Sequence, residues 1–342
     1  LNKAMTDGKL SDIVNPLSNI VGYENYADAK KAYNALMGGI YSKLLMLGAV
    51  DNNMPDVYQR VNLNTVKETG LDLPEVWAMA NIKGFNFDTD DEKFTFNGFG
   101  AQIGDDIFNN GEHFVGGIFA GFSANNFKQD SESGNMTDIS LGIYGGHFYN
   151  SIRLGWAFSL GMQNFSTQRD LSFANLKTES DFNTYSARFA GEIKYIANFY
   201  NDINLTPFIS AQGGYVMSGD IEEKSGAAAD LNIEASNYLR FYPTLGVGLE
   251  NKEGLFQWFI QGYIGYLIAG NKTPDYSLTF AQAKDLGTID IQGQELNSVI
   301  FGGGLGCEFV FSEYISIFIN SNLETTGIVT GYRAGAGVNI KI

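Results

Sequence analysis

The chain has 342 residues, a formal net charge of −16, and 41 glycines beside only 6 prolines. The acidic balance argues against a nucleic-acid partner, because phosphate binding needs a basic surface. The single cysteine, Cys307, excludes a disulfide within the chain and a cysteine metal cluster. The sequence shows no cofactor, nucleotide or metal motif and no nucleophile motif. We therefore expect neither an enzyme nor a cofactor-dependent protein.

The first 73 residues have helical character. In "YADAKKAYNALMGGIYSKLLML", apolar residues recur at spacings of three and four, which predicts an amphipathic helix over residues 28–50. Pro74 and the residues after it end this pattern. The sequence thus predicts a helical linker or plug at 1–73 and a second domain at 74–342.

From residue 75 to the end, apolar and polar residues alternate with the period of a β-strand. In "RLGWAFSLGM", Trp156 and Phe158 fall on one side, and Ala157 and Ser159 on the other. No run of about 18 apolar residues occurs, so no transmembrane helix is expected. Twelve such segments are predicted, at 75–87, 93–104, 113–122, 138–149, 151–163, 183–196, 204–217, 238–249, 255–268, 298–311, 314–322 and 329–342.

The connections between these segments alternate between long and short. The long ones span 123–137, 164–182, 218–237 and 270–296, whereas "YN", "ENKEG" and "FSE" are brief. Strands of this length, with loops sorted by length, are typical of an outer-membrane barrel. Lipid forbids an open sheet edge, so the last strand must pair with the first. We therefore predict an all-β fold, a 12-stranded antiparallel transmembrane β-barrel.

Charged and amide side chains fall on the predicted inner face. They are Arg153, Arg188, Glu192, Lys194, Arg240, Glu250, Gln257, Gln261, Glu308 and Arg333. One interpretation is a solvated wall with ion pairs between neighbouring strands, because barrel lumens are polar. The other is a charged sleeve that holds a helix and keeps a passing chain hydrated. A 12-stranded barrel has room for about one helix of 10–12 Å diameter, so residues 28–50 are expected inside the pore. A periplasmic helical hairpin is the alternative.

Several stretches resemble the β-domains of autotransporters. "VWAMANIKGFNF" followed by "FNGFGAQIGDD" is similar to the first hairpin of that family, and "YNALMGGIYSKLLML" resembles the helical segment before it. The final "GAGVNIKI" is similar to the assembly signal of such barrels, although the last residue is usually aromatic. The resemblance assigns Leu36, Gly38 and Tyr41 to the pore helix, and Gly337, Ile340 and Ile342 to the signal. Lys43 lies in the same predicted helix, and Gly38 with Gly39 is expected to let the helix backbone approach the barrel wall.

The resemblance implies a translocator that anchors an N-terminal passenger and exports it to the cell surface. Some autotransporters cut themselves between paired asparagines in the pore, which makes Asn52 and Asn53 candidate cleavage residues; a turn with a helix N-cap is the other interpretation. Expected partners are the passenger, outer-membrane lipid and lipopolysaccharide, the barrel-assembly machinery and periplasmic chaperones, with no nucleic acid and a monomeric state. The expected location is the outer membrane of a Gram-negative bacterium, with the long loops outside. A porin-like passive channel and a barrel that is itself an adhesin remain alternatives.

Overall fold

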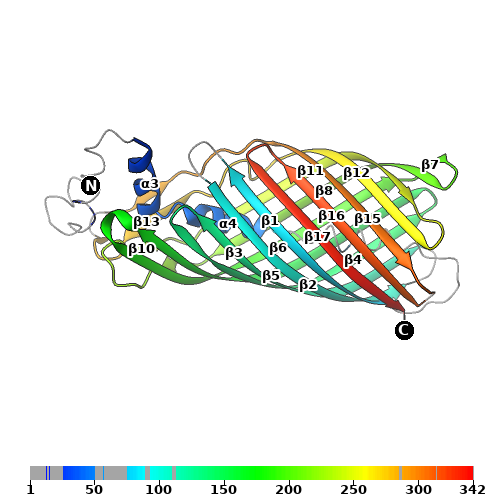
Figure 1. Ribbon diagram of the computed structural model, residues 1–342, viewed down its shortest axis with the longest axis horizontal. Helices are drawn as coiled ribbons and strands as arrows, with labels where there is room; N and C mark the ends of the chain where they lie inside the picture. The colour runs from blue at the N-terminus through cyan, green and yellow to red at the C-terminus, as the bar shows by residue number, and fades with distance from the viewer. Residues whose placement is uncertain are drawn as a thin grey trace.

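The computed structural model describes residues 13, 15, 26–50, 57, 75–88, 93–109, 113–284, 287–312 and 314–341. Within these residues, twelve antiparallel strands form a closed barrel (Figure 1). The barrel strands are β1 (Glu75–Asp88), β2 (Lys93–Asn109), β3 (Phe114–Gln129), β4 (Glu132–Tyr149), β5 (Ile152–Leu171), β6 (Leu176–Tyr195), β8 (Ile203–Ser218), β11 (Asn237–Asn251), β12 (Phe256–Tyr266), β15 (Val299–Val310), β16 (Ile315–Thr325) and β17 (Val329–Lys341).

Two pairings close the cylinder. β17 pairs with β1 over its whole length, with Gly335 opposite Asn81, and β8 pairs with β11. Each barrel strand thus has a hydrogen-bonded neighbour on both sides, as lipid requires. The predicted 12-stranded antiparallel fold is confirmed.

The barrel has two different ends. We call the end where β1 begins and β17 ends the turn end, because the connections of residues 150–151, 252–255 and 311–314 lie there. The opposite end is the loop end. At the turn end, β7 (Ala197–Tyr200) extends the hairpin between β6 and β8. β17 ends at the turn end, and α3 (Tyr26–Leu36) lies at the loop end (Figure 1).

Two of the four predicted long loops are strands instead. β3 and β4 pair through residues 123–137 and reverse at Asp130, which has φ +45°. β5 and β6 pair through 164–182 and turn at η1 (Ser172–Ala174) and Asn175, with φ +52°. The period of two continues there, but the outer face becomes polar because these parts extend beyond the apolar band, whereas the inner face keeps buried side chains such as Phe127 and Phe165. The prediction ended the strands where the lipid-facing pattern stopped, although the hydrogen bonding continues.

The other two long connections form a small sheet at the loop end. It consists of β9 (Ile221–Glu222), β10 (Leu231–Ile233), β13 (Tyr276–Phe280) and β14 (Ile289–Ile291), in the order β14-β13-β10-β9. We call these four strands the cap sheet. It joins segments that lie far apart in the chain, such as Ile233 and Leu278, which are 45 residues apart.

The N-terminal segment contains two helices, α3 (Tyr26–Leu36) and α4 (Ile40–Val50). The expectation of one continuous helix over 28–50 is wrong. Gly38 has φ +66°, a left-handed conformation that ends helices, and its N–H donates to Ala35 O at 3.3 Å. The turn allows α4 to enter the barrel while α3 remains at the loop end (Figure 1). The domain division at residues 73 and 74 stays a prediction.

Candidate functional site: the filled lumen

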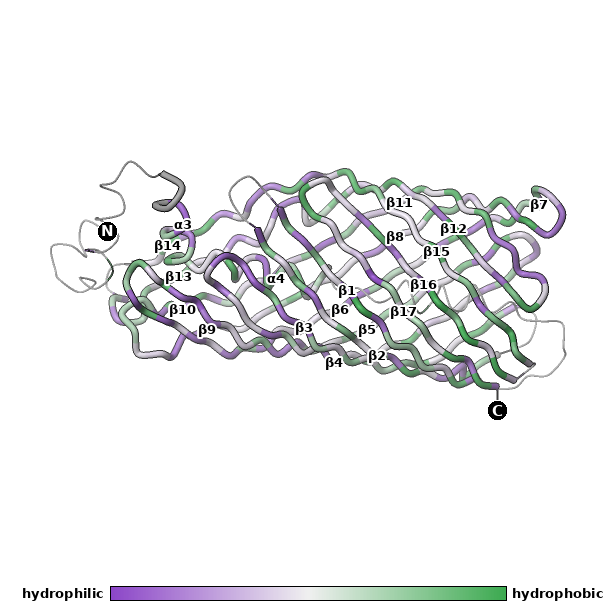
Figure 2. Tube along the Cα trace, viewed as in Figure 1, coloured by the Kyte–Doolittle hydropathy of each residue, from purple (hydrophilic) through white to green (hydrophobic). Residues whose placement is uncertain are grey.

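The strands separate a buried inner face from an exposed outer face. On β5, Ser159 is fully buried, whereas its neighbours Phe158 and Leu160 are 40% and 58% exposed. On β12, Gln261 is buried and Ile260 is 52% exposed. Apolar and polar positions alternate along the strands in Figure 2. None of the described helices has the length and apolarity to cross a membrane.

Helix α4 lies inside the barrel and packs against β6, β8 and β11 (Figure 1). Two glycines allow a close approach. A Cβ added to Gly48 of the helix would lie 2.9 Å from Val216 of β8, and a Cβ on Gly214 would lie 2.8 Å from the backbone of Ala49. Both contacts are shorter than side chains tolerate. The helix therefore touches the wall directly along β8.

A buried arginine of the wall binds the end of α4. Arg188 Nε donates to the Gly48 carbonyl oxygen at 2.9 Å, and its Nη1 pairs with Asp138 Oδ2 at 2.8 Å. Gln163 Nε2 donates to the other carboxylate oxygen, Asp138 Oδ1, at 2.8 Å. Carbonyls in the last turn of a helix lack intrahelical partners and carry partial negative charge. The guanidinium therefore satisfies the helix end and fixes it to β6.

A second arginine binds the end of α3. Arg169 of β5 donates from Nη1 to the carbonyl oxygens of Ala35 and Leu36. Its Nε and Nη2 bind the two carboxylate oxygens of Glu223, both at 2.5 Å. Tyr41 of α4 donates from its hydroxyl to Glu223 Oε1 at 2.7 Å. One fully buried ion pair thus connects the wall, both helices and the segment between β9 and β10.

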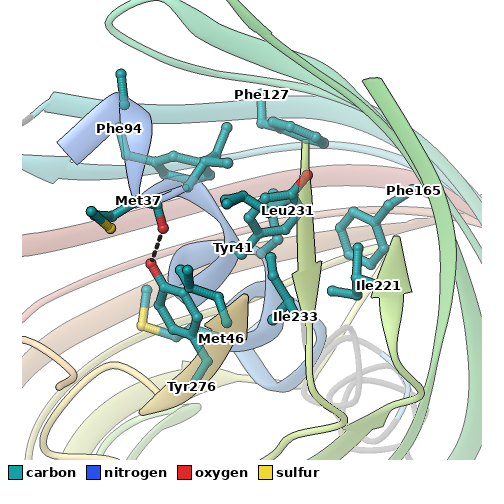
Figure 3. Packing of buried hydrophobic residues seen from close by; sticks show 14 of the residues in the cluster. Met37, Tyr41, Met46, Phe94, Phe127, Phe165, Ile221, Leu231, Ile233 and Tyr276 are labelled. Atoms are coloured by element: carbon teal, nitrogen blue, oxygen red, sulfur yellow. Dashed lines mark hydrogen bonds between the residues drawn. The ribbon is translucent and has the colours of Figure 1, made fainter. Parts of the chain in front are cut away.

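The cap sheet covers the turn between the helices. The Tyr276 hydroxyl donates to the carbonyl oxygens of Met37 and Gly38, at 2.9 and 3.1 Å. Leu231 packs against Gly38. Aromatic side chains of the barrel surround this contact (Figure 3); the buried cluster includes Phe85, Phe87, Phe94, Phe96, Phe127, Phe165, Phe182, Ile221, Ile233, Leu278 and Phe280. The loop end of the lumen therefore has an apolar core like that of a soluble domain.

At the turn end, the lumen holds a smaller apolar cluster that includes Val57, Trp77 and Phe119. Trp77 Nε1 donates to the Tyr144 hydroxyl at 2.9 Å, and that hydroxyl donates to Asp106. Val57 is fully buried in this cluster. The chain therefore passes from α4, in the loop-end half, to Val57, in the turn-end half, before β1 begins.

Charged side chains of the wall pair with one another at the turn end. Arg153 lies 3.1 Å from Glu250, and Lys194 lies 3.4 Å from Glu192 and 3.8 Å from Glu250. Lys252 lies 3.9 Å from Glu250. These five side chains come from β5, β6, β11 and the turn after β11, and they are largely buried. The described residues contain no group of three His, Cys, Asp or Glu side chains that would hold a metal ion.

Comparison with known proteins identifies this architecture. A model of the family described as "Autotransporter beta-domain" matches residues 76–322. The chain belongs to the autotransporter β-domain family. No match was found among curated protein sequences.

Solved structures share the fold at low sequence identity. The translocator domain of the autotransporter NalP from Neisseria meningitidis aligns with a TM-score of 0.66 and 15% identity, over 93% of this chain and 99% of that one. The transport unit of AIDA-I from Escherichia coli aligns with a TM-score of 0.57 and 15% identity, over 89% and 98%. The β-domain of the Bordetella autotransporter BrkA aligns with a TM-score of 0.56 and 12% identity, over 79% and 100%.

The residues expected on the inner face of this autotransporter β-domain are enclosed by the barrel. Nine are buried and Arg333 is half-buried: Arg153, Arg188, Glu192, Lys194, Arg240, Glu250, Gln257, Gln261 and Glu308 are the buried ones. Of these, Arg188 contacts the helix through Gly48 O. Arg240 instead pairs with Glu324 at 3.2 Å, and Glu308 accepts hydrogen bonds from Ser316 and Asn339. The structure thus divides this set between holding the helix and pairing within the wall.

The residues assigned to the pore helix lie on both sides of the helix break. Leu36 ends α3, Gly38 and Gly39 form the turn, and Tyr41 and Lys43 lie in α4. Leu36, Tyr41 and Lys43 are buried. Lys43 Nζ lies 5.5 Å from the centre of the Phe87 ring. The close approach expected at Gly38 and Gly39 occurs at Gly48 instead.

The C-terminal signal is described in part. Gly337 lies opposite Phe318 of β16, and a Cβ there would meet that ring at 2.4 Å. Ile340 is 41% exposed on the outer face. Ile342, Asn52 and Asn53 lie outside the described residues, so their roles stay predictions.

Four residues that hold the helices were missed from the sequence: Asp138, Arg169, Glu223 and Tyr276. Arg169 lies at an odd-numbered position of β5, like Arg153 and Ser159, and so on the inner face. Continuing the alternation through 164–182 would have placed it in the lumen. No local pattern signals Glu223, because its position depends on the folding of the cap sheet.

Proposed function

We propose that this β-domain anchors an N-terminal passenger in the outer membrane and exports it to the cell surface. The observation that supports the proposal most strongly is the path of the chain. It runs from α3 at the loop end, through α4 in the lumen, to Val57 at the turn end and then into β1. A passenger joined before α3 would therefore leave at the loop end, on the side opposite the end of β17 (Figure 1).

The loop end is proposed to face the exterior and the turn end the periplasm. Outer-membrane barrels have short periplasmic turns and longer outer connections, and here the cap sheet and the extended hairpins lie at one end. Barrel assembly would use the final strand with Gly337, Ile340 and Ile342, through the barrel-assembly machinery and periplasmic chaperones. Lipid and lipopolysaccharide would contact the outer face, and the closed barrel would act as a monomer.

A passive channel fits the lumen less well. Helix α4 and the cap sheet fill the loop-end half with apolar side chains, including Leu44, Leu47 and Phe94, which are fully buried. A porin needs a water-filled path. The adhesin alternative would use the cap sheet as its binding surface. The inner side chains of that sheet already pack onto the helices, so they would not be available to a ligand.

Surface exposure of the passenger tests the proposal. In cells that express the full-length protein, protease or antibody added outside should reach the passenger only when the barrel is intact. An upstream reading frame with a signal peptide directly before Leu1, and no passenger, would contradict the proposal.

Single-channel conductance tests the plug. The domain with residues 26–50 should conduct little, whereas deletion of residues 1–50 should raise the conductance markedly. Heat-modifiable migration on gels shows that both barrels are folded. Equal conductance in two folded barrels would place the helices outside the conducting path and favour the periplasmic hairpin.

A further inference from the structure

Two grooves lie side by side on the outer face of the barrel wall. The first has a volume of about 740 Å³ and is lined largely by small residues of β17, β1, β2 and β3. The second has a volume of about 640 Å³ and is lined by exposed apolar side chains such as Ile118, Leu141 and Phe158. Ile103 and Ala120 line both grooves. Small-molecule sites have volumes of about 300–1,000 Å³, so each groove is large enough for a hydrocarbon chain.

A single carboxylate, that of Asp105, lines the second groove. The next residue, Asp106, points into the lumen, where it accepts a hydrogen bond from Tyr144, so Asp105 faces outward. The Asp105 side chain is half-buried, and its Oδ1 atom is covered without a hydrogen-bond partner among the described residues. Oδ2 is therefore the oxygen that a ligand can reach. Of the described residues that line the two grooves, none is a lysine, arginine or histidine.

The carboxylate lies on the turn-end side of the grooves. Asp105 is paired with Val76, the second residue of β1, which begins at the turn end. Leu160, at the other end of the second groove, lies eight residues after Ile152, where β5 begins. That distance is about 20 Å along the barrel axis at the usual rise and tilt of a strand. The grooves therefore extend from the level of Asp105 towards the centre of the bilayer.

Asp105 needs a cationic partner from outside the chain. Exposed apolar side chains lie on both sides of it along β2, Ile103 towards the bilayer centre and Phe108 towards the turn end. A charge on the lipid-facing wall is costly unless a partner neutralises it. Among lipid headgroups, a phosphate would be repelled by the carboxylate, whereas an ammonium group attracts it. A primary ammonium also has three N–H donors, as in lysine, so it can form a charge-assisted hydrogen bond with Oδ2.

We propose that this surface binds one phospholipid with two acyl chains and a primary ammonium headgroup, from the leaflet at the turn end. The ammonium group donates to Asp105, and the acyl chains occupy the two grooves on either side of Ile103. Two grooves with a shared ridge match the two chains of one lipid, and one carboxylate matches one ammonium group. The inference needs only the outer-membrane location of the family and is independent of the direction of passenger export.

Native mass spectrometry of the purified 342-residue chain tests the headgroup. The protein in neutral detergent is titrated with phosphatidylethanolamine or with phosphatidylglycerol of the same acyl chains, and the dissociation constant of the first bound lipid is measured. The wild type should bind phosphatidylethanolamine about tenfold more tightly, which corresponds to one charge-assisted hydrogen bond. Asp105→Asn should remove this preference, whereas Asp181→Asn, at an exposed position of β6, should retain it. Equal affinities in the wild type, or a preference that persists in Asp105→Asn, would overturn the proposal.

A pair of substitutions on β3 tests the acyl-chain sites. Ala120→Phe places a ring where the two grooves meet, and Ala124→Phe, on the same face of the strand but outside both grooves, is the matched control. Both variants add an apolar side chain to the outer face, and heat-modifiable migration on gels shows that both barrels are folded. Ala120→Phe should bind phosphatidylethanolamine about fivefold more weakly than Ala124→Phe, because the ring occupies the space of the chains. Equal binding by the two folded variants would overturn the assignment of the grooves to the acyl chains.

Discussion

In the loop-end half of the lumen, wall arginines bind main-chain carbonyls of the helices, whereas in the turn-end half the charged side chains of the wall bind one another. Arg169 and Arg188 belong to the first group, and Arg153, Glu250 and Lys194 to the second. The first half also has an apolar core that includes the cap sheet. The comparison shows that similar charged residues either fix the plug or keep the wall polar, depending on what lies opposite them.

The largest expected effect comes from the ion pair at the end of α3. Arg169→Met leaves Glu223 buried without its partner, and removing one member of a buried pair costs about 3–5 kcal/mol. The free energy of unfolding of the purified domain, measured in denaturant, should fall by that amount. Conductance should also rise, because α3 and the cap sheet lose their common anchor.

A matched control lies on the next strand. Lys177 pairs with Asp170 at 3.9 Å, and the two side chains are 63% and 44% exposed. Lys177→Met should change the free energy of unfolding by only about 0–1 kcal/mol, because exposed pairs contribute little. Similar losses in the two variants would show that the Arg169 pair is not the anchor of the plug.

The turn-end cluster should be less sensitive. Glu250→Gln removes a carboxylate from three cations, but Lys194 keeps Glu192 at 3.4 Å. We expect a loss of about 1–3 kcal/mol in the free energy of unfolding, with unchanged conductance. An increase in conductance would mean that this half also holds the helix, and the contrast between the halves would be wrong.

A packing change tests how closely α4 lies against its wall. Gly48→Val forces a side chain into Val216 of β8, which a Cβ alone would already approach at 2.9 Å. Overpacking of this kind costs about 1–3 kcal/mol.

Adding Val216→Ala to the same chain should recover part of that loss. A double-mutant cycle measures the coupling between the two positions. Additive losses would show that the helix does not touch β8 there.

Much of this organisation could be predicted from the sequence, and the exceptions have physical causes. The barrel, its strand count and its inner face follow from the alternation of apolar and polar residues along each strand. This period of two arises because one face of the wall contacts lipid and the other faces the polar lumen. The extent of β3–β6 beyond the apolar band was missed because the outer face is polar there, so the lipid-facing pattern that marked the strands stops. Arg169 was missed for the same reason, since it lies in that extension. The helix break was missed because Gly38 and Gly39 were interpreted as sites of close packing against the wall. In the structure Gly38 instead has a left-handed φ of +66°, a conformation that ends a helix. Glu223 and Tyr276 reach the helices only after distant segments pair in the cap sheet.

The smallest expected effect is a pH dependence in the cap sheet. Asp275 precedes Tyr276, the residue that binds the helix turn, and accepts hydrogen bonds from the Gly293 N–H at 2.6 Å and Lys272 Nζ at 2.8 Å. The Gly293 N–H, and then Lys272, hold the pKa of the Asp275 carboxyl below its ordinary value of 3.8. Because the folded-state pKa is the lower one, the stabilisation is fully present above the ordinary value and is lost as the pH falls through the folded pKa. The thermal stability of the wild type relative to Asp275→Asn should therefore decrease as the pH falls through that window, and the carboxyl carbon shift of Asp275 should titrate below 3.8. The change should be small because the Asp275 side chain is 55% exposed. A stability difference that stays constant with pH would show that the carboxylate does not support the cap sheet, and that the contact of Tyr276 with the helices is independent of it.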